Sequence, residues 1–186
     1  QAAHLLRRVT FGVKKSQLDQ LIALGSAGAA VDFVLDVPQT TPAPPVNNYN
    51  NPDFTDPAVP LGQTWVNAPY YLEAEGARIE SWRGWWLDRM INSEANIQEK
   101  MTLFWHNHFA TAYSKVGGTF GAEHGTKMMD AVAGQVAGSR RGQIQLFRDM
   151  ATGRFDELLI EVAKDPAMLI WLDGRLNVRA RPQENF

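Results

Sequence analysis

The sequence predicts an all-α protein, an irregular multi-helix bundle with one long proline- and asparagine-rich loop. Apolar residues recur three and four positions apart along most of the 186-residue chain, which is the period of an amphipathic helix. No stretch alternates apolar and polar residues over the length of a strand, and no hairpin dipeptide joins two such runs. Eight of the ten prolines fall within residues 38–69, so this segment cannot be a helix or a central strand.

Three short helices are expected before this loop. The first ends at the Phe-Gly pair at 11–12, because glycine interrupts the helical pattern. Ser16 is a suitable N-cap for the second helix, and Gly25 favours its end. A third apolar run, over 27–37, ends before Pro38.

Residues 38–69 form the expected loop, and a structureless segment of this length is unusual inside a compact domain. Three interpretations remain open: an ordered loop that covers the helices, an arm that binds a partner, and a mobile segment. A surface loop between two helical halves is favoured. Its middle is crowded with asparagines: Asn47, Asn48, Asn50 and Asn51.

The helical period returns over 70–92, where three tryptophans lie on one face. Trp82, Trp85 and Trp86 are spaced three and four apart, and Met90 extends their row. This pattern favours a core helix with aromatic anchors. The alternative is an aromatic wall that lines a ligand-binding groove, with the three tryptophans as binding residues. Buried indole N–H groups need acceptors, so polar groups are expected near one or two of the rings.

The next helix begins at a capping-box pattern formed by Asn96 and Glu99. A glycine-rich loop follows at 117–125, and Pro166 occupies a favourable first position of a last short helix. Further helices are expected over 126–137, 142–153 and 154–165, the last with an apolar face made of Phe155, Leu158, Leu159 and Val162.

The stretch EKMTLFWHNHFAT, residues 99–111, contains two candidate site residues, His106 and His108. Side chains two positions apart diverge on a regular helix, so these two cannot both bind one metal ion. His108 falls on the apolar face with Phe104 and Trp105, which favours a histidine packed in the core.

His106 falls on the other face of the same helix, with Glu99 and Thr102. A solvated or hydrogen-bonded histidine is the simplest interpretation. The alternative is a polar pocket in which Glu99 and the histidines are catalytic and Asn107 orients one of them.

A metal site is possible but not favoured. His124 follows Glu123 in the glycine-rich loop, and it could join His106 or His108 and a carboxylate around a divalent metal ion. Two histidines and one carboxylate are a recognised ligand set. Nothing in the spacing requires it.

Composition excludes several other classes of protein. The net charge of −2, with acids and bases mixed, gives no basic tract for nucleic-acid binding. The absence of cysteine excludes disulfides, thiol catalysis and cysteine-bound zinc. No apolar run approaches the roughly 18 residues of a membrane span. The adjacent acids Asp156 and Glu157 are explained by a helix N-terminus, which they stabilise.

Four motifs together resemble a bacterial family called domain of unknown function 1800. They are AAHLLRRVTFG, EKMTLFWHNHFAT, GRFDELLIEVAKDPAMLIWLDG and RPQENF, and they span nearly the whole chain in order. Members of that family are usually longer, so the resemblance implies that residues 1–186 are the front part of a larger protein. It also implies export to the periplasm or the cell exterior. The family has no settled activity and therefore implies no reaction.

These observations lead to two hypotheses about function. The favoured one is a helical module for binding or assembly, whose partner is another protein or a later part of its own chain. Its contact candidates are the 38–69 loop and the tryptophan face. The alternative is a secreted metal-assisted hydrolase, with a site around His106 and His108 completed by residues beyond 186. An enzyme would place either histidine in a concave pocket beside a second titratable group.

Overall fold

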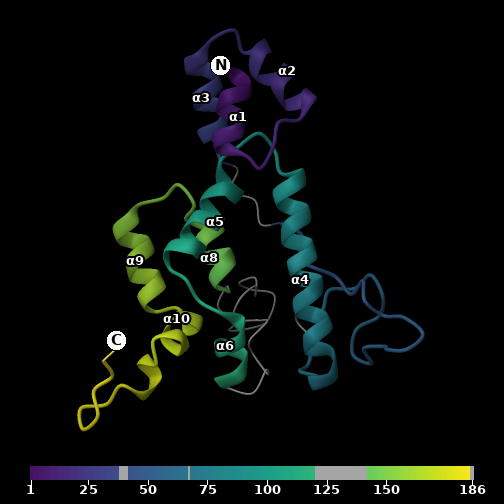
Figure 1. Ribbon diagram of the computed structural model, residues 1–186, viewed down its shortest axis with the longest axis vertical. Helices are drawn as coiled ribbons and strands as arrows, with labels where there is room; N and C mark the ends of the chain where they lie inside the picture. Colours follow the sequence, from purple (N-terminus) through teal and green to yellow (C-terminus); the bar gives the residue numbers. More distant parts are fainter. Residues whose placement is uncertain (38–41, 67, 120–141, 185–186) are drawn as a thin grey trace.

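The computed structural model describes residues 1–37, 42–66, 68–119 and 142–184 (Figure 1). These residues form helices and connecting loops without any β-strand, and three isolated bridges are their only β-type pairings. The predicted all-α class is therefore confirmed. The helix expected over 126–137 and the candidate ligands Glu123 and His124 lie outside the described residues.

Three short helices at the N-terminus form a unit at one end of the molecule (Figure 1): α1 (Ala2–Val9), α2 (Lys15–Ala23) and α3 (Ala27–Leu35). They enclose a small core centred on Leu6 and Val34, both almost fully buried. Gly25 ends α2 with a left-handed φ of 76°, a conformation that favours glycine. The predicted N-cap was wrong, because α2 begins at Lys15 and Ser16 lies inside it.

The larger part of the molecule is built around the 21-residue helix α4 (Leu72–Asn92). A short turn connects it to α5 (Gln98–His108), which packs against α8. The main core lies between these helices and the C-terminal ones (Figure 1). The remaining elements are α6 (Tyr113–Thr119), α8 (Gln143–Asp149), α9 (Phe155–Ala163), α10 (Pro166–Trp171) and the 3-10 turn η2 (Gly174–Leu176).

Residues 42–66 form an ordered loop beside α4 (Figure 1). Val59, Trp65 and Val66 are buried in the main core, each 2 % exposed or less. The Trp65 indole donates to the hydroxyl of Ser81 on α4 (3.4 Å), and that hydroxyl donates to the carbonyl of Val46 (2.7 Å). The described part of the loop is therefore ordered and packed against α4.

The two C-terminal helices follow the prediction with one correction. Asp165 caps α10 by accepting from the Met168 amide, and Pro166 takes the first helical position as expected. In α9 only one side of the predicted apolar face is buried: Leu158 and Val162 are 1 % and 3 % exposed, whereas Phe155 and Leu159 are about half exposed. The width of the buried stripe was therefore overpredicted.

No helix among the described residues combines the length and apolar character that crossing a bilayer requires.

Candidate functional site

Helix α5 buries its polar face, which reverses the predicted orientation. Glu99 and Thr102 are 2 % and 0 % exposed, whereas Phe104 is 50 % exposed and His108 is also exposed. The interpretation of His108 as a core histidine was therefore wrong. A carboxylate can be buried in this way only when opposite charges and hydrogen bonds compensate its lost hydration.

Two arginines and a tryptophan surround the Glu99 carboxylate. Oε1 accepts from Nε of Arg148 (2.7 Å) and from Arg89 at 2.9 and 3.1 Å, and Oε2 accepts from the Trp86 indole (3.1 Å). Burial alone would raise the pKa of Glu99, but the hydrogen bonds and charges of Arg148 and Arg89 hold that pKa below its usual value. Glu99 therefore stays ionised, as an electrostatic link between α4, α5 and α8.

The predicted capping box forms only in part. The Asn96 side chain accepts from the Gln98 amide (3.0 Å), but Glu99 is turned towards Arg148 instead of reaching back.

The three tryptophans of α4 differ in their surroundings. Trp82 and Trp86 are 6 % and 7 % exposed, so their rings are core anchors and present no contact surface. Trp85 is partly buried, its indole donates to the Ala43 carbonyl (3.0 Å), and its ring lies about 5.5 Å from the guanidinium groups of both arginines of the Glu99 cluster. Trp85 thus supports the ionic cluster through cation–π contacts.

His106 lies between two aromatic rings, with centroid distances of 5.8 Å to Trp86 and 6.4 Å to Phe147. Its Nδ1 atom is buried and has no hydrogen-bond partner among the described residues. Burial lowers the pKa of His106, because the imidazolium form would lose its hydration there. His106 is therefore a neutral imidazole near neutral pH.

The lowered pKa of His106 predicts an acid-sensitive stability. Below its ordinary pKa of about 6.5, the unfolded chain binds a proton that folded His106 resists. The stability contributed by neutral His106 is complete above about pH 6.5 and is lost as the pH falls towards the lowered folded-state pKa. Between about pH 6.5 and 5.5, we expect the free energy of unfolding to fall by up to about 1.4 kcal/mol per pH unit, measured by urea denaturation.

Two variants isolate this effect. His106→Phe should remove the pH dependence in that window, because phenylalanine fits between the same rings and does not titrate. His108→Gln, at an exposed position, should keep the wild-type slope. Glu99 and Asp56 do not contribute to the slope in this window. Because their pKa values are lowered, the stability that they provide is lost only below about pH 4.5. A wild-type slope in His106→Phe would show that another group is responsible.

The candidate metal ligands do not converge in the described part of the chain. His108 stacks on Phe104 at the surface, away from His106, and Asn107 is exposed. Among the described residues, no three histidine or carboxylate side chains lie close enough to hold a metal ion. The predicted set that includes His124 falls outside those residues.

Two polar cavities share residues of the turn that connects α4 to α5, and the smaller of them borders the Glu99 cluster. One, of about 340 Å³, is lined by Arg89 and Glu99 together with residues of the turn. The other, of about 540 Å³, lies between the same turn and the helices α2 and α3. Glu94 and Asn96 line both cavities. We call the two together the polar cleft.

Sequence reasoning missed Arg148 and this cleft. Arg148 follows Leu146 and Phe147 in a short helix whose residues are almost all buried. An arginine in such an apolar setting is a signal that a buried carboxylate must accompany it.

Comparison with known proteins adds a family. No curated protein and no solved structure matches the chain. The family that the four sequence motifs resemble is also found by comparison with family models, over almost the whole length of the chain. A family model described as Protein of unknown function (DUF1800) matches residues 4–186, and the chain therefore belongs to this family.

Proposed function

We propose that the chain is a polypeptide-binding module and that the ordered loop 42–66 is its principal contact element. The observation that carries this proposal is the order of a loop that has no helix or strand of its own. Loops of this length are usually either disordered or functional. A loop fixed by specific buried bonds belongs to the second group.

An ion pair anchors the loop to α4. The Asp56 carboxylate accepts from two nitrogens of Arg78, at 2.8 and 3.0 Å, and both side chains are almost fully buried. The hydroxyl of Tyr49 donates to the same carboxylate at 2.9 Å. Burial opposes ionisation of Asp56, but the Ala58 amide, Arg78 and Tyr49 together hold its pKa below the usual value.

The asparagines organise the rest of the loop. Asn47, 1 % exposed, accepts from the amides of Tyr49 and Asn50 and donates to the carbonyl of Val59 (2.7 Å). Asn51 accepts in the same way from the amides of Asp53 and Phe54. Such side-chain bonds fix turns locally. A partner that binds this loop would therefore have to order little of it, which favours affinity.

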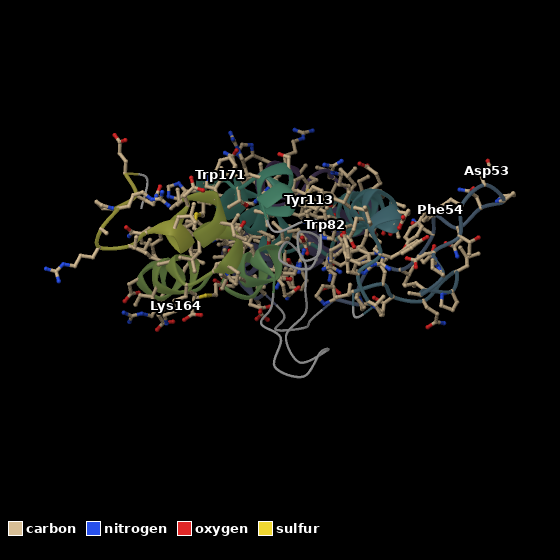
Figure 2. All side chains as sticks on the ribbon, turned by 90° about the horizontal axis from the view of Figure 1, so that it is seen from below. Asp53, Phe54, Trp82, Tyr113, Lys164 and Trp171 are labelled. Carbon is tan, nitrogen blue, oxygen red and sulfur yellow. The ribbon has the colours of Figure 1, made fainter. Side chains whose placement is uncertain are left out.

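The outer surface of the loop is available for contact. Figure 2 shows Asp53 and Phe54 at the outer end of the molecule, far from Lys164 and Trp171. Leu61 is 64 % exposed, and no lysine or arginine occurs within 38–69. A partner surface with apolar and hydrogen-bonding groups fits this loop best.

The hydrolase alternative has less support, because His106 lacks a titratable partner among the described residues and His108 points elsewhere. Export, which the family resemblance implies, remains part of the proposal.

The test uses a photo-reactive amino acid at position 61, in the organism that makes the protein. We expect a covalent adduct to one other polypeptide. The matched control places the same amino acid at Ile160, which is 54 % exposed on α9, and should give no such adduct. The purified partner should then bind Leu61→Asp at least about tenfold more weakly, a loss of about 1.4 kcal/mol. No adduct at position 61, or unchanged affinity in the variant, would refute the role of the loop.

A further inference from the structure

The polar cleft carries an excess of carboxylates. Asp36 and Glu94 line its larger cavity, and Asp88 and Glu94 line its smaller one. None of the three forms an ion pair with a described residue. Arg89 also lines the smaller cavity, but its guanidinium is already paired with Glu99.

Few cations near the cleft offset these charges. Lys14 donates to Asn92 at the rim of the smaller cavity (3.0 Å). Between Lys15 and Arg78 the sequence has seven acidic residues and neither lysine nor arginine. The larger cavity therefore offers a negative surface to a cationic group.

Two buried amides supply a second, independent observation. Gln17 and Asn96 are each only 9 % exposed, and both line the larger cavity. Gln17 donates its Nε2 to the carbonyl of Ser93 (2.8 Å), and Asn96 accepts the Gln98 amide with its Oδ1 (3.0 Å). Each amide thus uses one of its two polar atoms in a bond to the backbone. The other atom, Oε1 of Gln17 or Nδ2 of Asn96, has no hydrogen-bond partner among the described residues.

We propose that the polar cleft binds a peptide segment that carries a lysine or arginine side chain. The carboxylates of Asp36 and Glu94 receive the cation, and Oε1 of Gln17 accepts one further N–H. Nδ2 of Asn96 donates to a carbonyl of the bound backbone. Phe33, which also lines the cavity, covers the aliphatic stem of the basic side chain.

The mixture of groups selects this ligand class. A bare cation or a polyamine satisfies the carboxylates but has no acceptor for the N–H of Asn96. A peptide offers a cation and carbonyl acceptors together. This site goes beyond the contact proposed for loop 42–66. The groups assigned to the ligand belong to α2, to α3 and its C-terminal end, and to the turn after α4, and Pro42 of the loop lines only the smaller cavity.

The test measures fluorescence anisotropy of a short labelled Gly/Ser peptide with two lysines, in low salt, with purified protein. We expect saturable binding, and we expect the double variant Asp36→Asn/Glu94→Gln to weaken it at least tenfold. The matched control Glu157→Gln/Glu161→Gln removes two charges from exposed side chains of α9 and should change nothing. A peptide with norleucine in place of lysine should not bind.

Asn96→Asp separates a peptide site from a general cation site. Aspartate keeps the acceptor for the Gln98 amide but replaces the free donor by an acceptor. We expect this variant to bind the lysine peptide more weakly and spermidine, used as a competitor, more tightly. Three results would each overturn the proposal. The first is the absence of saturable binding, and the second is equal binding by the double variant. The third is an Asn96→Asp variant that binds both the peptide and spermidine more tightly. If these fail while position 61 still forms its adduct, the loop proposal stands alone.

Discussion

Glu99→Gln is expected to lower the free energy of unfolding by about 3–5 kcal/mol, which is the usual effect of removing one partner of a buried ion pair. The variant leaves the guanidinium of Arg148, whose side chain is 0 % exposed, without a compensating charge. Marginal stabilities of about 5–15 kcal/mol are typical of folded domains, so the loss is a large fraction of the total. Urea denaturation followed by far-UV circular dichroism measures it.

Two further variants test the cause. Glu161→Gln on α9 removes one half of an exposed pair with Lys164 and should cost less than about 0.5 kcal/mol. The double variant Glu99→Leu/Arg148→Met should be more stable than Glu99→Gln, because the fully buried guanidinium of Arg148 is removed and Arg89, 28 % exposed, can be hydrated. A loss below about 1 kcal/mol in Glu99→Gln would mean that Arg148 finds water or another partner, and that the cluster does not hold α5 on α8.

The helical class could be predicted from the sequence, but the orientation of α5 could not. Apolar periodicity placed Phe104 and His108 towards the core and Glu99 on the opposite face. The structure buries Glu99 because Arg148, 49 positions further along, supplies its counter-charge. Periodicity within one helix contains no information about a partner so distant in sequence. The divergence of His106 and His108 was predictable, since it follows from helix geometry alone.

The candidate contact regions were predictable only in part. Proline content located the loop 38–69, but not the buried bonds of Asn47 and Asp56 that order its described residues. The polar cleft draws on α2, α3, the turn after α4, the adjoining ends of α4 and α5, and Pro42, so no single motif marks it. Its one visible trace in the sequence is the absence of basic residues between Lys15 and Arg78.

Asp56→Asn is expected to release loop 42–66 from α4. Arg78, whose side chain is 1 % exposed in the wild type, would lose its shortest ion pair, and its remaining contacts with Glu75 and the carbonyl of Pro69 both lie outside the loop. We expect a loss of about 3 kcal/mol in the free energy of unfolding, at the lower end for a broken buried pair because Glu75 remains. Chymotrypsin should then cut the loop at Tyr49 or Phe54 at denaturant concentrations where the helices are still folded.

Tyr49 gives this prediction a spectroscopic readout. Burial and the hydrogen bond to ionised Asp56 raise its pKa to about 12, because a phenolate there would be desolvated and would face a negative carboxylate. In Asp56→Asn the repelling charge is gone and the loop opens, so the pKa of Tyr49 should fall towards its ordinary value of about 10. At about pH 11 the absorbance of phenolate should rise by close to one of the four tyrosines relative to wild type. Asp53→Asn, at the exposed tip, should change neither this absorbance nor the cleavage. An unchanged Tyr49 titration together with a resistant loop would mean that the asparagine bonds order the loop without the ion pair, and that the rigidity on which the proposed binding depends has another source.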